Sequence, residues 1–232
     1  MKRLLLSALP VLLALPAAAA WTVDTAGAPS GCTHVISDGN WTIGVYRYSD
    51  DNWNLGKYSG ANGSGYVAGS GDLDLRSVEA DCGVVIKASN NGALERISGL
   101  TSIIFPDSLQ TMYGNTVAGC TSLTNIVVGS GIRSIGQQAF YNCSSLKTIT
   151  LPEGCPGLTT LGQAAFRMCK ALETPLDFSR SVFTELPTYA LVDLQKVNEI
   201  RLPETLTTLG ILTVSAQNHC ILRICCIFAL DN

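Results

Sequence analysis

An internal repeat in the middle of the chain constrains its fold more than any other feature of the sequence. The segment 123–143 is followed by the segment 146–169, and the same residue types recur in both in the same order. Each segment begins with Leu-x-x-Ile, continues through a short apolar alternation, and ends with Gly-x-x-Ala-Phe-x-x-Cys. Repeats with a period of roughly 20–50 residues are typical of solenoids, propellers and arrays, so this feature decides the architecture first.

Five copies of the unit can be aligned by their first apolar residue, at spacings of 23, 23, 26 and 25 residues. The copies begin at Leu100, Leu123, Leu146, Leu172 and Val197. Apolar residues alternate with a period of two in the front half of each copy, which predicts a short strand with one buried face. The fourth copy has Pro175 where this strand should run, so we expect that strand to be shifted or broken.

A single unit cannot fold alone. About five large apolar side chains contribute on the order of 10 kcal/mol when they are buried, whereas ordering the residues of one unit costs roughly 1.5 kcal/mol each. Stacked units share a ladder of strands and one continuous core. The sequence therefore predicts a repeat solenoid of short β-strands, with turns or short helices on the convex side and with Ile126, Ile149 and Ile200 aligned inside it.

The motif resembles the BspA-like, or Treponema-type, leucine-rich repeat. The resemblance covers about residues 100–212 and rests on LTNIVV…IRSIGQQAFYNCSSLKTITLPEG, in which strand, Ile-Gly, Ala-Phe and Cys recur in order. It implies a right-handed superhelix on a bacterial or protist surface, and it implies a role in protein binding or adhesion. Residues 73–99 are interpreted as a degenerate first repeat.

The N-terminal part of the chain has no repeat. Residues 1–20 combine a basic start, an apolar run and small residues before Trp21, which predicts a secretory signal peptide. The apolar run is short for a membrane span, so we expect none after signal cleavage and a secreted or cell-surface location. Residues 21–72 are rich in turn formers and aromatic residues and predict an irregular β-type cap or small β module.

Residues 213–232 are interpreted as an incomplete last repeat or a truncated tail. The largely apolar stretch 220–230 contains Ile221-x-x-Ile224-x-Cys226, which predicts a strand at the end of the solenoid. An apolar strand at a sheet edge favours pairing with another chain, so end-on self-association is a further expectation.

Composition argues against several classes of function. Charged residues make up 14% of the chain, the formal net charge is −3, and no Lys/Arg cluster follows Arg3, so a nucleic-acid partner is not expected. His34 and His219 are the only histidines, which leaves little material for acid–base catalysis. No pair of C-x-x-C motifs occurs, so a zinc site is not expected, and neither is any other cofactor.

The nine cysteines need separate interpretations. Cys120, Cys143 and Cys169 recur once per repeat and are interpreted as small buried side chains at a crowded turn, with a disulfide ladder or reactive thiols as the alternative. Cys32 and Cys82 lie outside the clear repeats and are a possible disulfide pair. We expect a further cysteine, in the insertion Gly154-Cys-Pro-Gly157, to be exposed.

The concave strand face is the predicted binding surface, because curved solenoids expose an extended surface of this kind. Small polar and apolar groups with little charge alternate along it, which suits a protein or a glycan ligand whose identity the sequence does not indicate. The same side chains are also compatible with solvent-exposed strand positions that bind nothing. Its outward positions are Ser102, Ile104, Asn125, Val127, Thr148, Thr150, Glu199 and Arg201.

Two other functions remain open. Residues 21–72 are a candidate carbohydrate-binding or enzymatic module, because Trp41 and Trp53 have aromatic faces that stack on sugars. The chain is alternatively a truncated, nonfunctional fragment of a longer repeat protein. In the same region, Asp50-x-Asn52-x-Asn54 is similar to the start of a calcium loop, but the Gly and Glu that the loop needs are missing, so a solvated turn is favoured.

Overall fold

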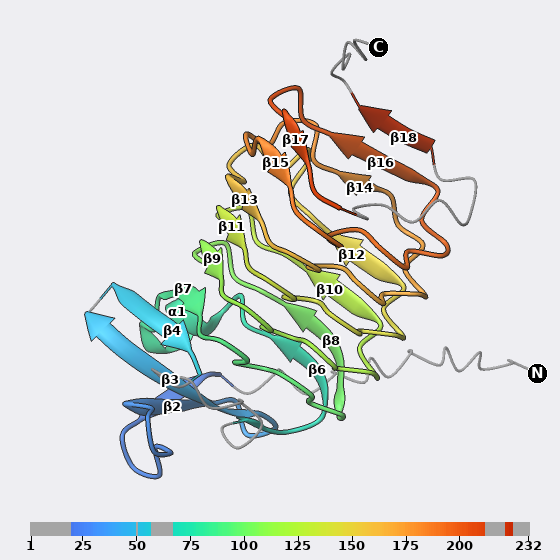
Figure 1. The fold of residues 1–232 in the computed structure, drawn as a ribbon. Coiled ribbons are helices and arrows are strands. Elements are labelled where there is room, and N and C mark those ends of the chain that lie inside the picture. The colour runs from blue at the N-terminus through green and yellow to red at the C-terminus, as the bar shows by residue number, and fades with distance from the viewer. Residues whose placement is uncertain (1–19, 50, 57–66, 212–220, 225–232) are drawn as a thin grey trace, which may run out of the picture.

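The computed structural model describes residues 20–49, 51–56, 67–211 and, for the backbone, 221–224. The predicted signal peptide therefore lies outside the described residues except for Ala20, and so do residues 213–220 and 225–232 of the C-terminal segment. The chain forms a single stack of rungs that runs from the N-terminal strands to β18 (Figure 1). Each rung crosses the stack twice and contributes one strand to each of two parallel ladders, which we call the front and back ladders.

The front ladder contains the strands that the sequence predicts. Its strands pair in parallel and in register, so that Ile126 lies beside Ile103 on one side and Ile149 on the other. The ladder is interrupted after its fourth strand, and the last three strands form a separate sheet. In order, the strands are β6 (Gly71–Asp74), β8 (Leu100–Ile104), β10 (Asn125–Val127), β12 (Thr148–Thr150), β14 (Leu176–Asp177), β16 (Glu199–Leu202) and β18 (Ile221–Ile224).

The back ladder replaces the turns or short helices that we expected on the other side of the solenoid. Most of its strands have two residues, and it is interrupted at the same rung as the front ladder. Its strands are β7 (Ile86–Ser89), β9 (Thr111–Met112), β11 (Ser134–Ile135), β13 (Thr160–Leu161), β15 (Glu185–Leu186) and β17 (Thr208–Leu209). The one helix in the described residues is α1 (Val78–Cys82), which precedes this ladder.

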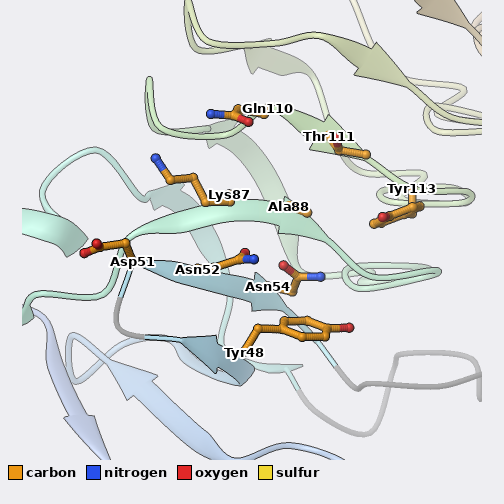
Figure 2. Close-up of a pocket in the computed structure, with 9 residues that line it drawn as sticks. All are labelled: Tyr48, Asp51, Asn52, Asn54, Lys87, Ala88, Gln110, Thr111 and Tyr113. Carbon is orange, nitrogen blue, oxygen red and sulfur yellow. The ribbon is translucent and has the colours of Figure 1, made fainter.

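The N-terminal strands extend the back ladder. Four of them form an antiparallel meander, a short fifth strand pairs with β3, and β4 pairs in parallel with β7 (Figures 1 and 2). The predicted β-type cap is thus present, and its sheet is continuous with the sheet of the repeats. The strands are β1 (Thr22–Asp24), β2 (His34–Ser37), β3 (Thr42–Ser49), β4 (Asn52–Leu55) and β5 (Val67–Ala68).

One apolar core lies between the two ladders. The side chains of Ile126, Ile149 and Ile200 are at most 4% exposed, as the repeat predicts. Aromatic rings continue this core through the interruption of both ladders, because the Phe166 ring lies 4.9 Å from that of Phe140 and 6.3 Å from that of Phe178.

The turns that join the two ladders also stack on one another. The backbone N–H of each turn donates to a carbonyl of the next rung, as from Val117 to Ala139 (2.9 Å) and from Phe140 to Ala165 (2.9 Å). These turns use left-handed backbone conformations that only some residue types favour. Residues other than glycine with positive φ in these turns are Arg96, Asn115, Gln138, Asn142, Ala164, Met168, Tyr189 and Asp193.

The recurring cysteines are structural. Cys120, Cys143 and Cys169 are fully buried, and each Sγ donates to a backbone carbonyl of the preceding rung at 3.0–3.2 Å. Their thiols are free, so the disulfide ladder is not formed. Leu194 occupies the corresponding buried position of the last complete turn without sulfur.

Two other expectations about cysteine differ from the structure. Cys155 is 1% exposed rather than exposed, because two turn hydrogen bonds, Cys155 N to Pro152 O and Leu158 N to Cys155 O, fold the insertion onto the core. Cys82 carries a free thiol whose Sγ donates to the Val78 carbonyl within α1 at 3.2 Å, so the suggested bond to Cys32 is not formed in this structure.

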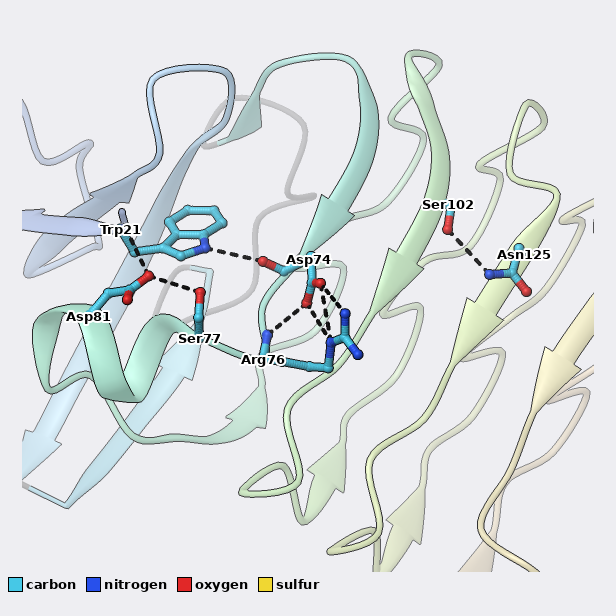
Figure 3. Close-up of polar contacts among 7 residues, drawn as sticks. All are labelled: Trp21, Asp74, Arg76, Ser77, Asp81, Ser102 and Asn125. Atoms are coloured by element: carbon cyan, nitrogen blue, oxygen red, sulfur yellow. Dashed lines mark hydrogen bonds and ion pairs between the residues drawn. The ribbon is translucent and has the colours of Figure 1, made fainter. Parts of the chain in front are cut away.

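Tryptophan side chains close the N-terminal end of the core. The indole Nε1 of Trp41 donates to the Asp72 carbonyl at 2.8 Å, and that of Trp21 donates to the Asp74 carbonyl at 3.1 Å. The backbone nitrogen of Trp21 also donates to Asp81 Oδ2 at 3.1 Å (Figure 3). Both rings are buried, and they connect the first strands of the chain to β6 and α1.

Candidate functional site

Six of the eight predicted binding residues lie together on the front ladder. Ser102, Asn125 and Thr148 form one row across β8, β10 and β12. Their side chains are hydrogen-bonded in series, since Asn125 Nδ2 donates to Ser102 Oγ at 3.3 Å and Thr148 Oγ1 donates to Asn125 Oδ1 at 2.7 Å (Figure 3 shows the first contact). The row is therefore pre-organised, and its amide and hydroxyl groups are partly used within the protein.

A second row runs parallel to the first. It contains Ile104, Val127 and Thr150, which occupy equivalent positions of the same three strands. Ile104 and Val127 are half-buried, whereas both threonines of β12 are exposed. The face thus combines an apolar strip with hydroxyl groups, which is a surface that another protein can cover.

The other two predicted residues belong to the second sheet of the front ladder. Glu199 and Arg201 lie on β16, and Arg201 forms ion pairs with Glu199 at 3.0 Å and with Asp177 of β14 at 3.3 Å. Because β14 does not pair with β12, these charges are not part of the same continuous ladder as Thr148. The reason is Pro175, which has no backbone N–H to donate to the neighbouring strand.

Sequence reasoning missed two residues of the face, which lie on its first strand. β6 places Asp72 and Asp74 in register with Ser102 and Ile104, so two carboxylates extend both rows. Arg76 donates to Asp74 and holds the pKa of that carboxyl below its usual value (Figure 3). The alternation Leu73-x-Leu75 indicated a strand here, but nothing in the sequence indicated its register.

A pocket of about 510 Å³ opens on the back ladder, where the cap joins the repeats (Figure 2). The rings of Tyr48 and Tyr113 border it and are 49% and 50% exposed. Its remaining lining is almost entirely polar. The other residues are Asp51, Asn52, Asn54, Lys87, Ala88, Gln110 and Thr111.

Asn52 and Asn54 belong to strand β4, so the interpretation of residues 50–54 as a solvated turn is wrong for these two. They are two residues apart on the strand, and Trp53 between them is buried. Asn54 is held in place, because its Nδ2 donates to Asn90 Oδ1 at 2.8 Å. In the described residues, no group of His, Cys, Asp and Glu is arranged to hold a metal ion.

The buried tryptophans remove the observation that favoured a sugar-binding module within residues 21–72. Trp41 is 0% and Trp53 6% exposed, so neither offers a face to a sugar. Trp53 instead contacts the His34 ring at 4.9 Å and the Arg47 guanidinium at 5.3 Å. The exposed aromatic groups near the cap are tyrosines.

The buried thiols are poor nucleophiles. Burial raises the pKa of Cys120 to about 11 and that of Cys169 to about 12, and it raises the pKa of Cys143 well above its usual value. Thiolates are the reactive form, so these groups stay protonated at neutral pH.

The part of the chain that the structure describes holds no helix with the length and hydropathy to traverse a bilayer. No curated protein matches the chain significantly. A family model for the BspA-type leucine-rich-repeat region matches residues 87–220 in six copies, which is more than half of the chain.

Solved structures with a similar fold come from bacteria. The pneumococcal vaccine antigen PcpA is 17% identical, with a TM-score of 0.50 over 82% of this chain and 48% of its own. A leucine-rich-repeat protein of T. pallidum is 22% identical, with a TM-score of 0.47 over 69% of this chain and 78% of its own. One from Bacteroides ovatus is 17% identical, with a TM-score of 0.43 over 72% of this chain and 54% of its own.

This chain therefore spans about half the length of the PcpA and B. ovatus structures. At this level of identity, the PcpA structure supports the fold alone. The family assignment rests on the repeats themselves, because the matched range 87–220 begins within β7 and includes every rung from β8 to β17. The chain belongs to the BspA-type leucine-rich-repeat family.

Proposed function

We propose that the protein is secreted or displayed at a cell surface, where it binds a partner protein through the front ladder without catalysis. The observation that carries the proposal is the pair of rows on β8, β10 and β12. Three strands in register present hydroxyl, amide and branched apolar groups as one extended surface. The family adds support, since its surface proteins suggest protein binding or adhesion.

The composition of the two rows favours a protein over a nucleic acid as the ligand. Interfaces of this kind combine an apolar centre with a polar rim. Ile104 and Val127 supply apolar area, while Thr148 and Thr150 are exposed beside them. Asp72 and Asp74 place two carboxylates at the N-terminal end of the face, and because Arg76 pairs with only one of them, the remaining negative charge disfavours phosphate groups.

A matched pair of variants on one rung tests the proposal. A partner is first selected on an array of purified extracellular proteins, and its dissociation constant is measured by biolayer interferometry. Thr150→Arg places a large charged side chain on the front ladder, whereas Thr160→Arg places the same group at the exposed position of β13 on the back ladder. We expect Thr150→Arg to weaken binding at least about tenfold, a change of roughly 1.4 kcal/mol, and Thr160→Arg to leave it unchanged.

Equal affinity of the two variants would remove the front ladder as the binding surface. Export is tested separately with the full chain. Expression in a bacterial host, followed by fractionation and N-terminal sequencing, should recover the protein outside the cytoplasm with Trp21 as its first residue. Recovery of the intact N-terminus in the cytoplasm would contradict the proposed location.

A further inference from the structure

We propose that the pocket on the back ladder is a binding site for a neutral saccharide. This inference goes beyond the proposed protein-binding role, because the pocket lies on the ladder opposite to the front rows. It also differs from a sugar-binding module within residues 21–72, since β7 and the segment around β9 supply five of the nine lining residues. The site exists only where the cap and the first repeats meet.

The aromatic border of the pocket is suited to the faces of sugar rings. A pyranose ring presents C–H groups on its faces and hydroxyl groups at its edge, so it packs against an aromatic ring while its edge remains available for hydrogen bonds. Tyr48 and Tyr113 are half-exposed at the pocket, and Figure 2 shows Asn54 between them. Tyr48 is further oriented by an edge contact with Tyr46, with ring centroids 4.8 Å apart.

The polar lining matches the donor and acceptor pattern of sugar hydroxyls. Each hydroxyl both donates and accepts, and so does each amide side chain. Asn52, Gln110 and Thr111 all line the pocket with groups of this kind. The amide of Asn54 also lines the pocket and adds an oriented acceptor, because the hydrogen bond from its Nδ2 to Asn90 limits its rotation.

The charges and the size of the pocket further restrict the class of ligand that can bind. Asp51 and Lys87 contribute one negative and one positive group, so the lining is neutral overall and favours an uncharged ligand. Ala88 is the single aliphatic residue in the lining, which gives an apolar peptide side chain little to pack against. A volume of about 510 Å³ lies within the usual range for small-molecule sites, roughly 300–1,000 Å³.

The test is a printed array of neutral oligosaccharides, with sialylated and sulfated oligosaccharides as charged comparisons, probed with the full chain. The neutral oligosaccharide that binds most strongly is then titrated by calorimetry against variants. We expect Tyr113→Ala to weaken binding about tenfold through loss of ring contact. We expect Asn52→Ala and Gln110→Ala to weaken it about fivefold each through loss of a hydrogen bond.

Two control variants separate this inference from the proposed function. Tyr141→Ala removes a half-buried tyrosine from a turn outside the pocket, and Thr150→Arg alters the front ladder, so both should bind the oligosaccharide as the unmodified chain does. Circular dichroism melts check that every variant is folded. The proposal is overturned if no neutral oligosaccharide binds, if charged ones bind more tightly, or if the three pocket variants retain full affinity.

Discussion

The two ladders are continuous in the N-terminal block of rungs and interrupted before the C-terminal block, and the contrast shows what holds the rungs together. In the N-terminal block, which ends with β12 and β13, both ladders run without a break. The C-terminal block begins with β14 and β15. β14 does not pair with β12 of the front ladder, and β15 does not pair with β13 of the back ladder. Repeats of the same type thus stack both with and without backbone pairing between the strands of adjacent rungs.

The residue after each back strand explains the interruption of the back ladder. Gly136 donates to the Met112 carbonyl and Gly162 to the Ile135 carbonyl, both at 2.7 Å, whereas Tyr113 at the equivalent position donates at 3.3 Å. A Cβ at Gly136 would lie 2.7 Å from Met112 O, so glycine permits the close approach of the rungs. The C-terminal block has Pro187 here, which lacks the N–H that would donate to Leu161.

The blocks remain connected through turns and core. Phe166 N donates to the Ala190 carbonyl at 3.0 Å, and Ile149 N donates to Thr174 Oγ1 at 3.1 Å. The comparison indicates that stacked turns and a shared apolar core tolerate the loss of one rung of sheet pairing. Four substitutions or conditions test this, in order of expected effect.

Gly162→Ala should be the most destabilising of these changes. Its added methyl group would overlap the Gln137 nitrogen and the Gly136 carbonyl carbon of the preceding rung, and backbone cannot move aside cheaply. We expect a loss of roughly 3 kcal/mol and a Tm lower by about 6–12 °C by calorimetry. Gly157→Ala is the matched control, because its methyl group would meet the flexible end of Arg133 instead. Equal losses in the two variants would contradict the role of close approach.

Cys143→Ala tests the turn stack within the N-terminal block. The substitution removes a fully buried sulfur and its hydrogen bond to the Val117 carbonyl. We expect a loss of about 2 kcal/mol and a Tm lower by about 4–8 °C. In the unmodified chain, a thiol reagent should modify Cys143 only after unfolding, and rapid modification of the native protein would disprove its burial.

Pro187→Gly tests whether proline alone separates the two back sheets. Restoring an N–H at this position should allow a bond to the Leu161 carbonyl, while the greater freedom of the unfolded chain offsets most of the gain. We therefore expect a change in stability within about 1 kcal/mol, together with slow hydrogen exchange at the new amide. Fast exchange there would show that Pro187 is not what keeps the two back sheets apart.

Acid should weaken a contact between two rungs of the N-terminal block. Asp107 accepts hydrogen bonds from Ser130 N at 2.7 Å and Ser130 Oγ at 2.9 Å, which lower the pKa of its carboxyl below the usual 3.8. A lowered pKa in the folded state contributes stability above pH 3.8, and this contribution is lost as the pH falls through the lower value. Asp107→Asn should lower Tm by about 1–2 °C at pH 7, and the difference should vanish near pH 2. A difference that persists in acid would contradict this account.

The front ladder was predictable because its signal is local and repeated. Alternation around Ile126 and Ile149 indicated strands, and Pro175 indicated the rung where the strand is displaced. The Ala-Phe-x-x-Cys motif likewise indicated a buried turn. The structure confirms these features. They were predictable because each depends on the residues of a single rung.

The back ladder and the pocket were not predictable in the same way. Strands of two residues, such as β11, are too short to show periodicity. Asn142, Gln138 and Ala164 all have positive φ. Asparagine tolerates this conformation, whereas glutamine and alanine seldom adopt it, so nothing in the sequence indicated it at Gln138 and Ala164. The pocket brings together Tyr48 and Tyr113 through the parallel pairing of β4 with β7, which no local pattern encodes.

The contact between the Trp21 backbone nitrogen and Asp81 gains a role if residues 1–20 are removed as proposed. In the unprocessed chain this nitrogen is an uncharged amide, and Asp81 also accepts a hydrogen bond from Ser77 at 2.8 Å. Hydrolysis of the Ala20–Trp21 bond would convert it into an ammonium group beside a carboxylate. Under the proposed export, removal of residues 1–20 would thereby create an ion pair between the new N-terminus at Trp21 and Asp81 of α1.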